Sequence, residues 1–347
     1  MRHPILKSAV FSLIAAITLQ LASVLASAQQ PPRIKVGTIA PRGSVYHQAL
    51  LEMGESWRRA EAQGAAFTVF TDGSQGGEAD VVRRMRIGQL NAALISVIGL
   101  TEIDAGPGAL QKMPLMFRSW DEVDAAGHRI RPLIEKRLLD KGFVVLFWAE
   151  GGWVRFFSKE RALHPADFKR MKMFAWSGDP EQIALMKAMG YQPAVLETAD
   201  ILPGLQTGLV NAVPVTALWA LATQIDTMAP HMLDLRWVPI VGAAVMTRNA
   251  WDKLTPSGQE ALKRAAEKAG EQLRAQRATA DAEAVDAMRK RGLQVHALTP
   301  ELEAEWRQLA EGVYPKIRGG MVPADMFDAV RGALEEYRAS AGAGAGR

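Results

Sequence analysis

The residues best suited to acid–base chemistry are two carboxylates, Glu150 and Asp179, each of which closely follows an expected strand. Two acids that face each other across a cleft can serve as general acid and general base. Asp179, however, directly precedes Pro180, where a carboxylate would cap the first turn of a helix. We therefore expect Asp179 to be a helix cap rather than a catalytic acid.

Other signatures of an enzyme or a metal site are missing from the sequence. Cysteine is absent, which excludes a thiol nucleophile and a thiolate metal site. The histidines after His3 are far apart and form no HxH or HExxH motif. There is no GxSxG motif, and the loop DGSQGGE at 72–78 lacks the glycine spacing that cradles a phosphate. We expect no catalysis, no metal and no cofactor.

The first 28 residues are typical of a secretory signal peptide. Arg2 and Lys7 precede an apolar run at 9–25, and Ala26–Ala28 form a small-x-small cleavage site. A membrane anchor is the alternative. We expect cleavage near Ala28 and export to the periplasm, and without cysteine there is no lipid anchor.

Removal of this segment lowers the formal net charge from +4 to +2, because Arg2 and Lys7 leave with it. A nearly neutral chain lacks the excess of basic residues that is typical of nucleic-acid-binding proteins. Because disulfides are impossible, a hydrophobic core must stabilise the exported chain, which is long enough for two domains.

A phrase near the start of the chain is repeated about 120 residues later. DVVRRMRIGQLNAALIS at 80–96 aligns with DILPGLQTGLVNAVPVT at 200–216. The identical positions include Asp80 and Asp200, Gly88 and Gly208, Asn91 and Asn211, and Ala92 and Ala212. Each copy predicts a helix, a left-handed glycine cap and a strand. The repeat indicates two similar lobes with a cleft between them, although helix–glycine–strand is a common arrangement that could match by chance.

The remaining pattern alternates strands with helices, which is typical of a parallel α/β sheet. We expect strands at 33–39, 67–71, 92–97, 141–148, 154–158, 171–176, 192–195, 212–215 and 238–247. We expect helices at 45–62, 78–87, 180–189, 200–207, 257–290, 300–311 and 323–337. The predicted fold class is α/β, a two-lobe periplasmic-binding-protein fold (type II-like), each lobe a mostly parallel sheet with helices on both faces.

The predicted boundaries follow from these elements. Lobe I comprises residues 29–150 and about 239–256, and lobe II comprises 151–238 and the C-terminal helices. The helix at 257–290 spans both lobes, and the tail at 339–347 is frayed. Ligands of open parallel sheets bind at the carboxyl ends of the strands, so we expect a ligand in the cleft and closure by a hinge.

Four stretches carry a resemblance to a known family: GGEADVVRRMRIGQLNAALIS, KMPLMFRSWDEVD, HPADFKRMKMF and LPGLQTGLVNAV. Over nearly the whole exported chain the sequence resembles the DctP-type solute receptors of tripartite ATP-independent periplasmic (TRAP) transporters. The resemblance implies closure around one small ligand and its delivery to membrane permease subunits driven by an ion gradient. It also implies a helical-repeat partner protein, because some branches with apolar pockets work with one.

The sequence departs from the family pattern at two ligand contacts. In most members the strand after the Pro-x-Asp turn ends in an arginine that grips the carboxylate of the ligand. Here that place falls on Phe174, and a second usual contact, an asparagine, falls on Val215. An earlier family arginine is present as Arg155.

These departures predict an apolar ligand. A polar group left unpaired against Phe174 and Val215 would cost roughly 1–3 kcal/mol, whereas an apolar group would gain about 25 cal/mol per Å² buried. Indole rings also fall at strand ends or just after them, at Trp148, Trp153, Trp176 and Trp219. We expect these residues, with Tyr46 and Gln75, to enclose a small hydrophobic or aromatic monocarboxylate-like ligand whose acid group is held by Arg155.

Two alternatives remain open at this point. The tryptophans could pack in the core or between the lobes. The carboxylate could instead be held by Lys172, by Arg42 or by N–H groups at a helix start. The ligand would then be an ordinary organic acid, such as a keto acid, a dicarboxylate or a sugar acid, with a relocated carboxylate grip.

Overall fold

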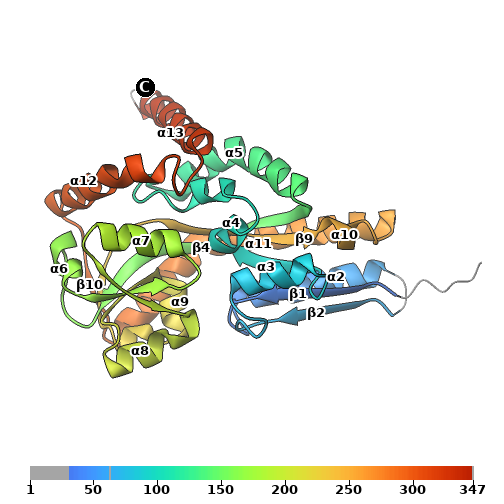
Figure 1. The fold of residues 1–347 in the computed structure, drawn as a ribbon, viewed down its shortest axis with the longest axis horizontal. Helices are drawn as coiled ribbons and strands as arrows, with labels where there is room; N and C mark the ends of the chain where they lie inside the picture. The colour runs from blue at the N-terminus through green and yellow to red at the C-terminus, as the bar shows by residue number, and fades with distance from the viewer. Residues whose placement is uncertain (1–30, 62–63, 346–347) are drawn as a thin grey trace, which may run out of the picture.

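The computed structural model describes residues 31–61 and 64–345 (Figure 1). The predicted signal peptide, 1–28, lies outside the described residues. Among the helices that are described, none combines the length and the apolar character needed to cross a bilayer.

The strands form one connected sheet. Its members are β1 (Arg33–Thr38), β2 (Ala66–Phe70), β3 (Ala92–Ser96), β4 (Phe143–Ser158), β5 (Lys172–Trp176), β6 (Gln192–Leu196), β7 (Ala212–Thr216), β8 (His231–Leu233), β9 (Pro239–Thr247) and β10 (Gln294–His296). The main order is β2-β1-β3-β9-β4-β7-β5-β6, with β8 beside β4 and β10 beside β8.

Most helices begin at a side-chain cap, as the sequence led us to expect at Ser44 and Asp179. The helices are α2 (Val45–Ala60), α3 (Glu78–Arg86), α4 (Val97–Thr101), α5 (Trp120–Asp140), α6 (Pro165–Lys169), α7 (Pro180–Ala188), α8 (Ile201–Thr207), α9 (Ala217–Ala222), α10 (Arg248–Trp251), α11 (Pro256–Lys290), α12 (Pro300–Ile317) and α13 (Ala324–Ala345). Helix α13 continues to Ala345, where we had expected a frayed tail.

The sheet is mixed. Its outer pairs are parallel (β1 with β2 and β3, and β5 with β6 and β7), whereas β9 and β4 run antiparallel to their neighbours at the centre. The two strands predicted at 141–148 and 154–158 are the single strand β4. The glycine pair between them does not break the strand, because a register shift at Glu150–Gly152 and a positive φ of 101° at Gly152 absorb the bend.

The α/β two-lobe fold is confirmed. Strand β4 passes from the half that contains β1, β2, β3 and β9 into the half that contains β5, β6 and β7 (Figure 1). Helix α11 packs against α2 in the first half and against α9 in the second. The residue boundaries of the lobes stay our prediction; below, lobe I and lobe II denote these two halves.

Helices cover both faces of the sheet in each lobe. In lobe I, one core cluster joins the sheet to α3, α4, α5 and α13, and another joins it to α2 and α11. In lobe II, one core cluster packs against α8, α9 and α11, and the other against α6, α7 and α12.

The repeated phrase forms two equivalent corners. Gly88 and Gly208 adopt left-handed conformations with φ of 75° and 73°. The following asparagines each donate a 2.9 Å backbone hydrogen bond to the first part of a neighbouring strand, Asn91 to the Lys35 carbonyl and Asn211 to the Lys172 carbonyl. The repeat therefore marks the same structural unit in each lobe.

Candidate ligand-binding cavity

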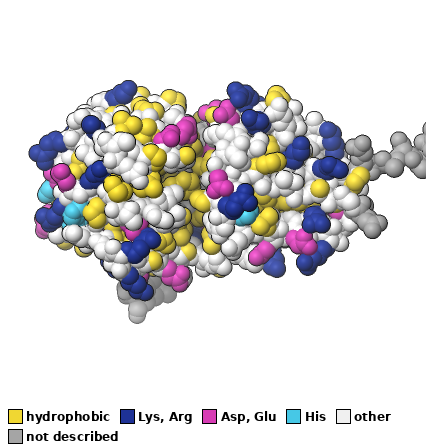
Figure 2. Space-filling model, turned by 90° about the horizontal axis from the view of Figure 1, so that it is seen from below, with side chains coloured by type: hydrophobic (Ala, Val, Ile, Leu, Met, Phe, Trp, Pro, Cys, Tyr) yellow, Lys and Arg dark blue, Asp and Glu magenta, His cyan; other side chains and the backbone are white. Residues whose placement is uncertain are grey.

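A cavity of about 590 Å³ lies between the lobes, which is within the usual 300–1,000 Å³ of small-molecule sites. Its walls include the ends of β1, β3, β5 and β7, the edge at which ligands of α/β sheets bind. Figure 2 shows hydrophobic side chains gathered in the furrow between the two halves of the molecule.

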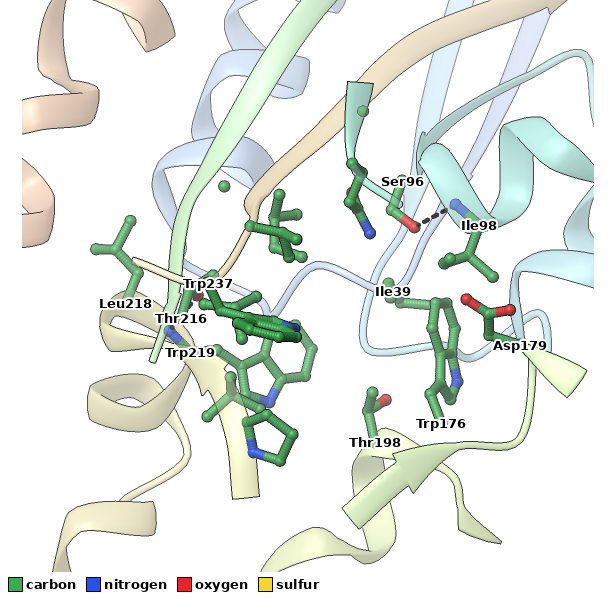
Figure 3. Close-up of a pocket in the computed structure, with 18 of the residues that line it drawn as sticks. Ile39, Ser96, Ile98, Trp176, Asp179, Thr198, Thr216, Leu218, Trp219 and Trp237 are labelled. Atoms are coloured by element: carbon green, nitrogen blue, oxygen red, sulfur yellow. Dashed lines mark hydrogen bonds between the residues drawn. The ribbon is translucent and has the colours of Figure 1, made fainter. Parts of the chain in front are cut away.

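Three tryptophans form opposite sides of this cavity (Figure 3). Trp176, at the end of β5, lies beside Ile39 of lobe I, and Trp219 and Trp237 lie together on the other side. The Trp176 indole N–H donates a 3.1 Å hydrogen bond to Glu197, which fixes the plane of this ring. Flat apolar rings of this kind suit an apolar or aromatic guest.

The repeated phrase positions two cavity-lining helix starts. Its last residues, Ser96 and Thr216, end β3 and β7 and cap α4 and α9. The Ser96 hydroxyl accepts a 3.1 Å hydrogen bond from the Ile98 amide, and Thr216 accepts one of 3.3 Å from the Trp219 amide. Both caps line the cavity, which Figure 3 shows for Ser96 and Ile98. In each lobe, the same local sequence therefore ends a strand and begins a helix at the cavity.

The cationic side chain at the cavity is already paired. Lys112 is the one cationic side chain among the described residues that line it. Its ammonium lies 3.3 Å from Asp179 and 2.9 Å from Glu181, and its side chain is only 5% exposed. Asp179 also caps α7 by accepting a 3.1 Å hydrogen bond from the Gln182 amide, as predicted. A ligand carboxylate would therefore compete with two acids for this cation.

Glu78 is a second buried acid of the cavity wall, and it is held by lobe I alone. Its carboxylate accepts hydrogen bonds of 2.7 Å from the Ser96 amide, 2.7 Å from the Ser96 hydroxyl and 2.8 Å from the Gly99 amide. Burial raises the pKa of Glu78, and these hydrogen bonds offset only part of that effect. This side chain ties α3 to the start of α4.

Glu150, the other carboxylate singled out in the sequence, has arginine partners. Its side chain is fully buried and lies 2.6 Å from Arg131 and 3.5 Å from Arg277. The Tyr46 hydroxyl donates a 2.8 Å hydrogen bond to the Glu150 backbone carbonyl. Glu150 and Asp179 are thus each engaged with a cation, and neither is placed as a free acid or base.

Five of the nine predicted ligand contacts line the cavity: Tyr46, Phe174, Trp176, Val215 and Trp219. Phe174 is buried, with 6% of its surface exposed, and Val215 is partly buried. The two positions at which the family pattern is polar are therefore apolar parts of the cavity wall. Their contact with a ligand stays a prediction.

Arg155 is not among the lining residues. Its Nε lies 2.7 Å from Asp234, and its two terminal nitrogens lie 3.0 and 2.9 Å from the carboxylate oxygens of Asp281 on α11. Burial alone would lower the pKa of Arg155, but hydrogen bonds and charge from Asp281, and then from Asp234, raise it. A guanidinium engaged by two carboxylates has little capacity left for a ligand, so we do not carry Arg155 into the proposed ligand contacts.

Trp148, Trp153 and Gln75 are not lining residues either. The two tryptophans belong to the core of lobe I, which is the packing alternative left open above. The Trp148 indole donates a 2.7 Å hydrogen bond to Glu135, and Trp153 packs on Trp120 with 4.9 Å between ring centroids. Gln75 lies in the loop before α3.

Two of the alternative carboxylate holders named above, Arg42 and Lys172, are occupied or distant. Arg42 lines no wall of the cavity, is 79% exposed and lies 3.9 Å from Asp72. Lys172 is exposed at the far end of β5 and donates a 3.2 Å hydrogen bond to the Gly208 carbonyl.

Sequence reasoning missed Lys112 and Trp237. Trp237 directly precedes β9, whereas the prediction places lining tryptophans only at the carboxyl ends of strands or just after them. Because β9 runs antiparallel to β3, its start lies at the same edge as the end of β3. Lys112 lies in an irregular segment whose position no periodicity predicts.

Residues 36–319 match the family of bacterial extracellular solute-binding proteins, family 7, also called DctP. The chain belongs to this family. Members are solute-binding receptors rather than enzymes, and no catalytic role is needed for the buried acids.

Relatives and solved structures agree with this assignment. A solute-binding protein of Roseobacter denitrificans is 24% identical over 256 residues, which cover 72% of this chain and 77% of the relative. A TRAP periplasmic solute-binding protein of Ralstonia eutropha with bound (S)-2-acetolactate has a TM-score of 0.81 at 21% identity and covers 88% of this chain and 99% of that one. DctP7 of Bordetella pertussis, a receptor binding pyroglutamic acid, has a TM-score of 0.78 at 18% identity and covers 87% and 99%. At these identities the structures establish the fold alone.

Proposed function

We propose that this TRAP-family receptor acts in the periplasm, closes over a small, largely hydrophobic or aromatic organic molecule with at most one acid group, and delivers it to membrane permease subunits driven by an ion gradient. One observation carries the proposal: Trp176, Trp219, Trp237, Phe174 and Val215 are part of the cavity wall, and Lys112, the one cation among the described lining residues, is already paired with two acids. An apolar guest gains burial energy there, whereas a second carboxylate would find no unpaired cation among the described lining residues. A helical-repeat partner protein is part of the same proposal and rests on the resemblance alone.

The direct test is mass spectrometry of the molecule that remains bound to receptor purified from the periplasm and is released by denaturation. We expect a hydrophobic molecule with one acid group or none. A dicarboxylate or a sugar acid would contradict the proposal.

A second candidate is a receptor for an ordinary small organic acid, held by Lys112 instead of by an arginine. It is favoured by the position of Lys112 in the cavity wall and by the organic acids bound to the similar receptors above. Replacement of Lys112 by Met should abolish binding in that case, whereas a hydrophobic guest would lose little affinity. Lys112→Met also leaves Asp179 buried without its cation, so Lys112→Met/Asp179→Asn separates that loss from ligand binding. Lys172→Met, at an exposed lysine outside the cavity, controls for the loss of a lysine alone.

A further inference from the structure

We propose that part of the cavity is a chamber inside lobe II that takes a flexible hydrocarbon chain, so that the ligand is a small amphipathic molecule with an aliphatic tail. This inference rests on the proposed function and narrows its ligand class. Six lining residues define the inner chamber. Phe156, Met173, Met186, Met189 and Trp306 belong to or pack against one core cluster of lobe II, and Val313 borders the chamber from the core cluster of lobe I.

The inner chamber lies on the opposite face of the lobe II sheet from Phe174. Met173 and Phe174 are neighbours on β5, and successive side chains of a strand point to opposite faces. Phe174 belongs to the core cluster packed against α8, α9 and α11, and Met173 belongs to the cluster packed against α6, α7 and α12. Because one cavity touches both residues, it extends past the strand ends and beneath α7 and α12.

The lining of the inner chamber suits a chain of variable shape. None of the six residues is charged, and three are methionines, whose unbranched side chains adapt to irregular guests. The Trp306 indole N–H donates a 2.8 Å hydrogen bond to the Leu163 carbonyl, so it is already satisfied within the protein. A ligand that filled only the space between the tryptophans of the cleft would leave this chamber without contacts.

Serine and threonine hydroxyls gather in the part of the cavity between the lobes, whereas Tyr191, which also carries a hydroxyl, lines the cavity within the core cluster of the chamber. Ser44, Ser96, Thr198 and Thr216 line the part between the lobes, and Figure 3 shows three of them around the cleft. The hydroxyl, ester or single acid group of the ligand would stay at this end, while the tail enters lobe II.

The test measures affinity along two series of straight-chain compounds, n-alkanols and n-alkanoates of about 4 to 14 carbons, by calorimetry below their micelle concentrations. If the tail enters the chamber, affinity should rise about fourfold for each added CH₂, the factor that corresponds to roughly 0.8 kcal/mol, until the chamber is full. An affinity that stops rising at about six carbons, while short members still bind, would overturn the chamber and leave the proposed function intact. Failure of every member and of aromatic acids to bind would overturn both.

Filling the chamber provides the second arm. Met186→Trp should lower the affinity of long chains at least tenfold and leave short members unchanged. Met171→Trp is the matched control, because Met171 is also buried in this core cluster but does not line the cavity. Should Met186→Trp not fold, Met189→Trp at a partly buried position tests the same point. Equal shifts for the Met171 and chamber variants would refute the chamber.

Discussion

The sharpest prediction concerns Arg155, which the family pattern assigns to the ligand and the structure assigns to an ion pair. Its guanidinium is 6% exposed and faces the Asp281 carboxylate through two nitrogens and Asp234 through a third. If these contacts are its role, Arg155→Met should destabilise the protein without a specific effect on ligand affinity.

The expected loss can be worked out from burial. Asp281 is 8% exposed, and removal of one partner of a buried ion pair costs about 3–5 kcal/mol because the other charge stays buried and unpaired. Asp234 is 43% exposed, so its contribution is at most about 1 kcal/mol. The free energy of unfolding should therefore fall by about 3–6 kcal/mol.

Urea unfolding followed by tryptophan fluorescence measures this loss, and calorimetry on the folded variant measures affinity. The double variant Arg155→Met/Asp281→Leu should recover most of the stability, because no unpaired charge then remains. Arg248→Met is the control, since its partner Asp252 is exposed and the loss should stay below about 1 kcal/mol. A variant of normal stability that no longer binds its ligand would show that Arg155 is a ligand contact after all.

Three further perturbations test other parts of the structure. Phe174→Arg would place a cation in the apolar wall, and succinate should then raise the melting temperature of this variant but not of the wild type; no such shift would place Phe174 outside the site. Glu197→Leu removes the acceptor of the Trp176 indole N–H and should weaken binding of aromatic guests several-fold, and unchanged affinity would contradict a role for that contact. Nε2 of His296 lies 3.0 Å from Nδ1 of His231. Burial, and then the charges of His231 and Arg161, lower the pKa of His296. The unfolded chain therefore binds more protons below about pH 6.5, and stability should fall from there toward pH 5 in the wild type but less in His296→Gln.

Sequence reasoning recovered the parts of the fold that local patterns determine. The caps at Ser44 and Asp179, the left-handed glycines of the repeat and the long helix α11 each follow from a few neighbouring residues. The two-lobe class followed from the repeat and from the alternation of strands and helices. Phe174 and Val215 were found because a family pattern names their positions.

The errors came from long-range pairing, which no local pattern contains. The direction of β9 decides that Trp237 reaches the cleft, and only its pairing with β3 and β4 reveals that direction. The partners of Arg155 are 79 and 126 residues away in the chain. Tryptophans at or just after strand ends therefore lie in two environments. Trp176 and Trp219 line the cavity, whereas Trp148 and Trp153 pack in the core of lobe I.

The ion pairs between α11 and β4 involve other residues than the predicted apolar ligand contacts. Helix α11 carries Arg277 and Asp281 one turn apart, and they pair with Glu150 and Arg155, which flank Gly152 at the bend of β4. A side chain at Gly152 would need the left-handed φ of 101° and would lie 3.2 Å from the Asp281 carboxylate, so the bend requires glycine.

These pairs fasten the long helix to β4 on both sides of the bend. The predicted ligand contacts, Phe174 and Val215, take no part in these pairs, so they can differ from the family pattern without loosening this junction. The ion pairs of Arg155 give this residue a structural role that does not involve the ligand. If that is so, exchange of the apolar wall residues should change which molecule binds, whereas exchange of the residues around Gly152 should change how firmly the two lobes are joined.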